Sequence, residues 1–130
     1  MKKETEELLL VIAEGAQQTA ENYCDDFEMI ENAMNRLACS AAALEDTADI
    51  EERLYGMAKE GKSVCYRIHV LSFLAVWCNA AKYYEALQEL LLGKNDVTKE
   101  AKFFLYYQMM SKQFTNEQLQ NEQTQWNQNK

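Results

Sequence analysis

Apolar positions between Leu9 and Leu44 recur every three or four residues, and this spacing constrains the fold more than any other feature. An α-helix turns once every 3.6 residues, so positions with this spacing fall on one stripe of a single helix. The spacing predicts one amphipathic helix from about Lys3 to about Leu44, about 60 Å long at 1.5 Å per residue, with a bend or break near Gly15 as an alternative. The positions on the stripe are Leu9, Ile12, Ala16, Thr19, Tyr23, Phe27, Ile30, Met34, Leu37, Ala41 and Leu44.

Turn-forming residues are scarce, and this favours an all-α fold. The 130 residues include no proline and only four glycines, too few for a many-turned β-sandwich. A chain of this length fits one domain with an apolar core. We expect an all-α helical bundle of four to five helices, with a very long first helix and a central third helix. The bundle domain is predicted over residues 1–114, and a polar Gln/Asn-rich tail or peripheral helix over 115–130.

Capping residues and glycines predict where the next helices begin and end. Thr47 is the expected N-cap of a short second helix that stops at Gly61. Ser63 is the expected cap of a third helix, which runs to about Leu92 and finishes at Gly93 in a left-handed turn. Apolar residues surround most of this third helix, so we expect neighbours on several sides.

Two residues of the third helix bear on function. His69 is the one histidine of the chain and lies in an apolar stretch, which favours a core or interface role over a general base. Trp77 shares a stripe with Phe73 and is expected in the core. No glycine-rich phosphate loop or other catalytic motif accompanies them.

The last part of the chain combines aromatic residues with a polar tail. Asn95 or Asp96 is expected to cap a fourth helix, with an apolar stripe at Phe103, Tyr107, Met110 and Phe114. In the tail, Leu119 and Trp126 lie seven residues apart and would share one side of a helix. We therefore expect these two residues to contact a partner.

The four cysteines, Cys24, Cys39, Cys65 and Cys78, are scattered and form no C-x-x-C pair. This spacing predicts free thiols, no metal site and a reducing, cytoplasmic setting. No signal peptide is expected, because acidic residues precede the short apolar stretch near the N-terminus. The longest apolar run, residues 68–81, is shorter than the roughly 20 residues of a membrane span. No cofactor and no membrane contact are expected.

Two pairs of carboxylates offer a catalytic alternative. Glu28 and Glu31 form an E-x-x-E pair, and Asp46 and Asp49 form a D-x-x-D pair further on. The layout resembles that of the all-α nucleotide pyrophosphatases, which implies a Mg-dependent nucleotide hydrolase. Helix caps and a solvated acidic face explain the same residues more simply.

Charge is divided unevenly along the chain. Residues 1–60 carry 15 acidic and 5 basic side chains, a net charge of -10, and residues 61–130 carry 6 and 8, a net charge of +2. Such an acidic half repels nucleic acid and suits a basic partner surface. An acidic mimic of nucleic acid, which would inhibit a nuclease or DNA-binding protein, is an alternative.

These patterns favour a non-catalytic protein–protein interaction module, acting as an adaptor, chaperone-like subunit or inhibitor through a helical, acidic surface. The expected partner-binding residues are Glu28, Glu31, Leu119 and Trp126. The stripe of the long first helix needs more cover than the other helices offer, so a homodimer formed through that helix is also expected.

Overall fold

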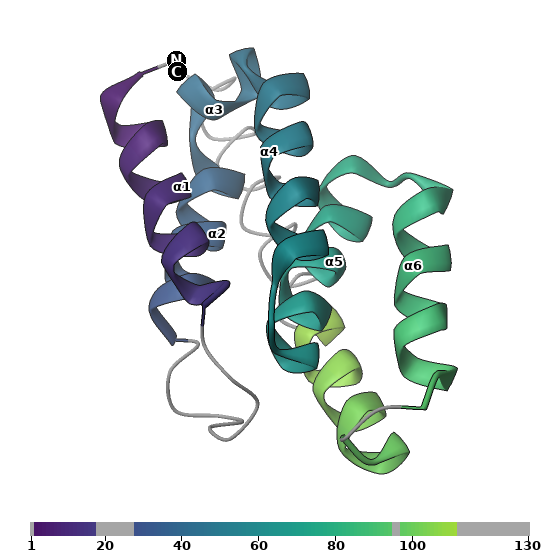
Figure 1. Cartoon of the computed structure of the whole chain (residues 1–130). Helices are drawn as coiled ribbons and strands as arrows, with labels where there is room; N and C mark the ends of the chain where they lie inside the picture. The colour runs from purple at the N-terminus through teal and green to yellow at the C-terminus, as the bar shows by residue number, and fades with distance from the viewer. Residues whose placement is uncertain (1, 18–27, 95–96, 112–130) are drawn as a thin grey trace.

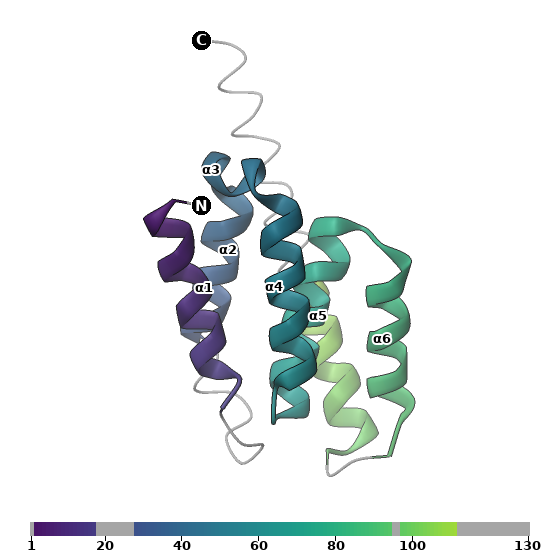
Figure 2. The same cartoon turned by 45° about the horizontal axis from the view of Figure 1, so that its top comes forward.

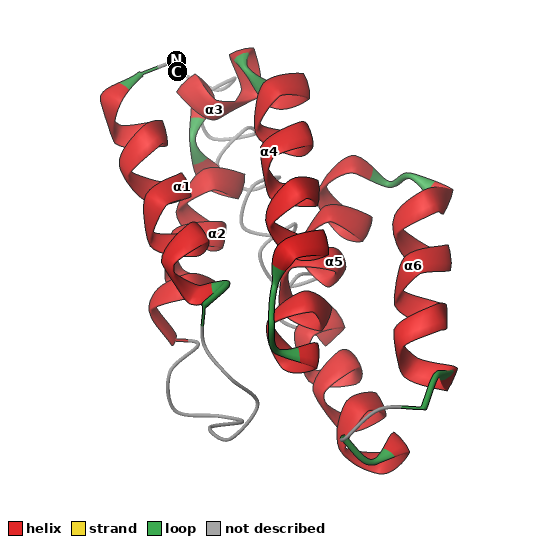
Figure 3. Cartoon of the chain, in the orientation of Figure 1, coloured by secondary structure: helices red, strands yellow, loops and turns green. Residues whose placement is uncertain are grey.

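The computed structural model describes residues 2–17, 28–94 and 97–111, and all regular structure among them is helical (Figure 3). An unlabelled helical segment over residues 99–111, here called the C-terminal helix, follows α6. The all-α class is therefore confirmed, with more and shorter helices than predicted. None of the described helices is long and apolar enough to cross a membrane. The labelled helices are α1 (Lys3–Gly15), α2 (Glu28–Cys39), α3 (Ala41–Glu45), α4 (Thr47–Glu60), α5 (Val64–Cys78) and α6 (Ala81–Leu92).

The prediction of a very long first helix is wrong. Helix α1 ends at Gly15, and α2 lies beside it and runs in the opposite direction (Figures 1 and 2). The predicted apolar stripe faces the core in both helices, because Leu9 and Ile12 of α1 and Met34 of α2 are completely buried. Two short helices that pack together cover their stripes, whereas one long helix would leave much of its stripe in water. The stripe ends before Leu44, which is 60% exposed.

The predicted third helix is two helices. Asn79 adopts the left-handed conformation, with φ 49° and ψ 46°, and ends α5 so that α6 returns alongside it. Asparagine is the residue type, after glycine, that most readily takes this conformation. The central position is confirmed for α5, because every residue from Ile68 to Ala75 is buried. Trp77 lies at the edge of the core, where it is half-buried and stacked on Phe73 with ring centroids 5.4 Å apart.

The caps agree with the prediction in part. Ser63 caps α5 as expected, and its hydroxyl accepts a hydrogen bond from the Tyr66 amide at 3.4 Å. Thr47 is the first residue of α4, not its cap, and its hydroxyl donates to the Leu44 carbonyl at 2.9 Å. Gly93 ends α6, but in an extended conformation with φ -72° instead of the left-handed turn.

Tyr66 joins the first hairpin to α5 at the centre of the fold. Its ring is completely buried, and its hydroxyl donates to the Ile12 carbonyl at 2.7 Å. Gly15 and Gly61 make room for it, because a Cβ on Gly61 would lie 2.5 Å from Tyr66 Cδ1 and one on Gly15 would collide with Ile30. Two helix-ending glycines therefore also permit close packing of helices.

The C-terminal helix presents a different face to the core from the one predicted. Thr98 caps it by accepting a hydrogen bond from the Ala101 amide at 3.3 Å, whereas the predicted caps Asn95 and Asp96 lie outside the described residues. Its buried side chains are Lys102, Leu105 and Met109, whereas Tyr107 of the predicted stripe is 65% exposed.

A buried lysine replaces the expected apolar contact at the start of this helix. Lys102 is 2% exposed, and its ammonium group donates to the carbonyls of Leu90 at 2.9 Å and Gly93 at 2.8 Å. These carbonyls lie at the C-terminal end of α6, where cations are favoured. The predicted boundary at 114 and the tail over 115–130 lie outside the described residues.

Candidate functional site

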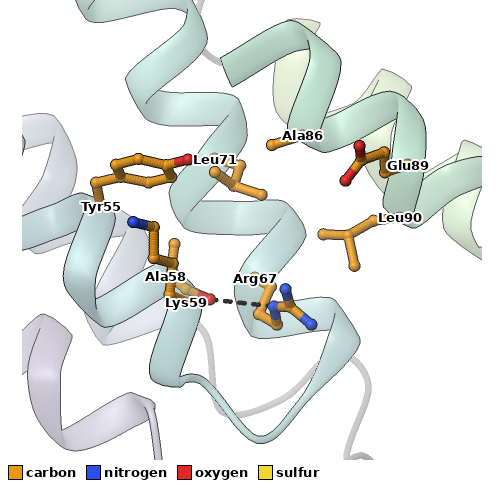
Figure 4. A pocket seen from close by; sticks show the side chains of 8 residues that line it. All are labelled: Tyr55, Ala58, Lys59, Arg67, Leu71, Ala86, Glu89 and Leu90. Atoms are coloured by element: carbon orange, nitrogen blue, oxygen red, sulfur yellow. Dashed lines mark hydrogen bonds between the residues drawn. The ribbon is translucent and has the colours of Figure 1, made fainter. Parts of the chain in front are cut away.

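A pocket of about 220 Å³ opens between α4 and α6, over α5 (Figure 4). Helices α4 and α6 each pack against α5, so α5 forms its floor. The pocket lies near the end of α4 and the start of α5. It combines small and apolar groups with two cations and one carboxylate. The lining residues are Tyr55, Ala58, Lys59, Arg67, Leu71, Ala86, Glu89 and Leu90.

The charged groups of the pocket have few internal partners. Arg67 donates from Nε to the Ala58 carbonyl at 3.1 Å, which fixes the guanidinium at the pocket edge (Figure 4). Its two terminal nitrogens form no hydrogen bond within the described part of the chain. Lys59 Nζ lies 4.1 Å from the centre of the Tyr55 ring, a cation–π contact. Glu89 lines the opposite wall without an ion pair to any described residue.

A second group of contacts closes the space between α4 and α6 toward the other end of the helices. The Tyr83 hydroxyl donates to Glu51 Oε1 at 2.5 Å, and Lys82 Nζ lies 3.8 Å from the same oxygen. Tyr55 and Tyr83 pack edge to face, with ring centroids 5.2 Å apart. Burial, together with the neighbouring Glu51 carboxylate, raises the pKa of Cys78 to about 11. The thiol is therefore held in its neutral form, and these contacts join α4 to α6 at the end away from the pocket.

The C-terminal helix carries an exposed aromatic surface, which we call the aromatic face. Phe104 is 69% exposed and Tyr107 65% exposed, and Phe103 and Tyr106 lie half-buried beside them. The Tyr107 ring contacts both half-buried rings, with centroids 6.2 Å from Phe103 and 5.5 Å from Tyr106. Three of these rings are thus in contact through Tyr107, and Phe104 is exposed on the same helix.

His69 occupies the core position that its sequence context predicted. It is 2% exposed, with Nδ1 2.7 Å from the Cys65 carbonyl and Nε2 3.1 Å from Glu31 Oε1. A carbonyl can only accept, so Nδ1 carries a hydrogen, and the contact with Glu31 is a hydrogen bond when a proton lies between the two groups. The contact of Nε2 with Glu31 thereby joins α5 to α2, whereas Nδ1 is bonded within α5 itself.

The predicted carboxylate residues are dispersed. Glu28 is exposed at the start of α2, whereas Glu31 is partly buried and bonded to His69. Asp46 and Asp49 lie at the start of α4, at the opposite end of the bundle from Glu28 (Figure 2). The described residues contain no group of three or more His, Cys, Asp or Glu side chains able to hold a metal ion. The structure therefore does not bring the two pairs together.

Several other acidic side chains fasten helices together. Nη1 of Arg53 on α4 donates a bifurcated hydrogen bond to both carboxylate oxygens of Glu6, each at 2.9 Å, and Glu4 pairs with Arg36 of α2 at 3.1 Å. The Glu4–Arg36 pair is largely solvent-exposed and adds little stability, whereas the Glu6–Arg53 pair is partly buried. Part of the acidic half is thus committed to internal contacts.

The remaining predictions have mixed outcomes. Leu119 and Trp126 lie outside the described residues, as does Cys24. Cys39, Cys65 and Cys78 are free thiols, as expected. Sequence reasoning missed the pocket, because the pocket assembles residues from three helices. The aromatic stretch over residues 103–107 is a sequence feature that favours protein contacts, but the exposure of Phe104 within it could not be read from the spacing.

Comparison with protein-family models, with curated proteins and with solved structures finds no match to this chain.

Proposed function

We propose that this chain is a non-catalytic protein–protein interaction module that self-associates through the aromatic face of the C-terminal helix. The observation that carries the proposal is the exposure of Phe104 and Tyr107 in a segment without charge. No charged residue occurs over positions 103–111, although 26% of the whole chain is charged. Large uncharged aromatic patches are typical of contact surfaces.

Charge distribution favours a second copy of this chain as the occupant of the aromatic face. Residues 1–60 carry a net charge of -10, so two copies that met through α1 and α2 would bring like charges together. Residues 61–130 carry a net charge of +2, and contact through the C-terminal helix keeps the acidic halves apart. The long first helix that motivated a dimer through the N-terminal region does not exist, which moves the proposed interface to the aromatic face.

The acidic half remains a proposed surface for a second, basic protein. The nucleic-acid-mimicking inhibitor receives less support, because Glu4, Glu6, Glu31 and Glu51 already have partners inside the molecule. A Mg-dependent hydrolase receives the least support, because the two carboxylate pairs that it would need lie at opposite ends of the bundle. The free thiols of Cys39, Cys65 and Cys78 support a proposed cytoplasmic location.

Sedimentation velocity across micromolar concentrations tests self-association. We expect the wild-type chain to move from a species of 15.1 kDa to twice that mass as concentration rises. Phe104→Glu places a charge in the aromatic face and should hold the chain at the monomer mass. Met29→Glu is the matched control, because Met29 on α2 is also 69% exposed, and it should leave the dimer intact. A wild-type chain that stays monomeric, or a control that dissociates equally, contradicts the proposal.

A further inference from the structure

We propose that the pocket between α4, α5 and α6 binds a small monocarboxylate with a short apolar body. The inference goes beyond the self-association proposed above and uses different residues. It depends on the shape of the pocket, on the free edge of Arg67, and on the balance of charge around the opening.

The volume of the pocket limits the part of a ligand that it can enclose. At about 220 Å³ it is smaller than the roughly 300–1,000 Å³ of pockets that hold drug-sized molecules. Its apolar surface comes from Ala58, Leu71, Ala86 and Leu90, with the Tyr55 ring at one side. A ring or a branched aliphatic group fits this surface, whereas a nucleotide is too large.

Arg67 supplies the carboxylate-binding group. Because Nε is bonded to the Ala58 carbonyl, the guanidinium is held in place before any ligand arrives. The two terminal nitrogens remain available and can donate a parallel pair of hydrogen bonds to the two oxygens of a carboxylate. A preorganised donor pair loses little conformational entropy on binding.

Charge balance selects a monoanion. Lys59 and Arg67 contribute two positive charges to the lining, and Glu89 contributes one negative charge, which leaves one positive charge to be neutralised. A dianion such as phosphate would meet Glu89 and the net charge of -8 on the whole chain. The same chemistry is offered by a free small carboxylate and by the carboxyl terminus of a peptide ending in an apolar residue.

Titration of the ¹⁵N-labelled full chain with benzoate, followed by amide chemical shifts, tests the proposal. We expect shifts in residues lining the pocket, with a Kd on the order of 1 mM for so small a ligand. Benzamide, the neutral isostere, should bind at least about tenfold more weakly, because it lacks the charge that pairs with Arg67. Equal binding of benzamide, or shifts confined to other regions, would overturn the proposal.

Charge-changing variants locate the binding group. Arg67→Gln should weaken benzoate binding at least about tenfold, and Glu89→Gln should tighten it about two- to fivefold by removing repulsion. Lys3→Gln, an exposed lysine on α1, removes the same charge far from the pocket and should leave binding unchanged. If Arg67→Gln fails to fold, Lys59→Gln and Glu89→Gln carry the test. Unchanged affinity in both would refute the assignment.

A second pair of probes separates the two sources of the carboxylate. N-acetyl-leucine presents the carboxyl terminus of a peptide, and N-acetyl-leucinamide is its neutral counterpart. Tighter binding of N-acetyl-leucine than of benzoate assigns the pocket to a peptide terminus, and the reverse order assigns it to a free acid. Absence of a difference between N-acetyl-leucine and its amide, together with equal binding of benzamide and benzoate, overturns carboxylate recognition from either source.

Discussion

The two sides of α5 are held in different ways. On one side, α1, α2 and α4 are fastened by contacts between residues far apart in the chain, including the Tyr66 hydroxyl on the Ile12 carbonyl and His69 on Glu31. On the other side, α6 packs against α5, Lys102 joins the C-terminal helix to the end of α6, and that helix leaves Phe104 and Tyr107 exposed. Both sides therefore contribute to the core, but the exposed aromatic surface lies on the C-terminal side.

The largest expected effect comes from Tyr66→Ala. Removal of a completely buried ring should lower the free energy of unfolding by about 3–5 kcal/mol, through lost contacts and a cavity between Gly15 and Gly61. Urea denaturation followed by circular dichroism measures the loss. Tyr84→Ala on α6 is the control, because Tyr84 is 40% exposed and should cost about 1 kcal/mol or less. Similar losses in both variants would mean that the buried ring that joins α5 to the first hairpin contributes no more than an exposed ring on α6.

A smaller loss is expected from Lys102→Met. The variant removes the ammonium group that donates to the carbonyls of Leu90 and Gly93, which should cost about 1–3 kcal/mol. Amide hydrogen exchange should show the loss of protection in α6 and the C-terminal helix, with α1 and α2 little affected. Lys99→Met, an exposed lysine on the same helix, is the control. Loss of protection spread evenly over the molecule would mean that Lys102 supports the whole core.

Trp77→Ala should destabilise the fold by about 1–2 kcal/mol. Trp77 is half-buried, so truncation removes less buried area than at its stacking partner Phe73, which is completely buried. Phe73→Ala should cost about 3–5 kcal/mol in the same denaturation experiment. Equal losses would place Trp77 inside the core, as its position in the sequence suggests.

The smallest predicted effect appears at alkaline pH. Burial raises the pKa of Tyr66 well above its ordinary value of 10.0. As pH rises, the unfolded chain therefore releases this proton at a lower pH than the folded chain does. The contribution of Tyr66 to stability is fully present below pH 10 and is lost as pH rises above it. For one tyrosine with this shift, the free energy of unfolding at about pH 10.5 is about 0.8 kcal/mol lower than at neutral pH. Tyr66→Phe should lose less stability than the wild type between pH 9 and pH 10.5, and identical losses would show that Tyr66 ionises freely in the folded chain.

The helical class and the central helix could be predicted because hydrophobic periodicity reports local burial. The hairpin of α1 and α2 could not, because spacing shows which side of a helix is apolar and not where the chain reverses. Gly15 was the one visible signal at that break, and glycine is tolerated inside helices. At the second break, the reversal depends on the backbone conformation of the single residue Asn79.

The candidate site was harder to predict than the fold. Arg67, Lys59 and Glu89 come from three helices, and no local pattern relates them before those helices pack. Lys102 could not be placed from the sequence either. A lysine predicts an exposed position, and the carbonyls that explain its burial belong to the end of another helix, α6.

The order of the helices has a consequence for how fast the chain folds. Helix α1 packs against α2, α4 against α5, and α5 against α6, so most contacts join neighbours in the sequence. Chains dominated by such local contacts reach the native state in microseconds to milliseconds, because little loop-closure entropy is lost at each step. The Tyr66 contact to Ile12 spans 54 residues and is among the most distant. We expect the hairpins to form early and this bond to close late, as the step that commits the chain to its final structure.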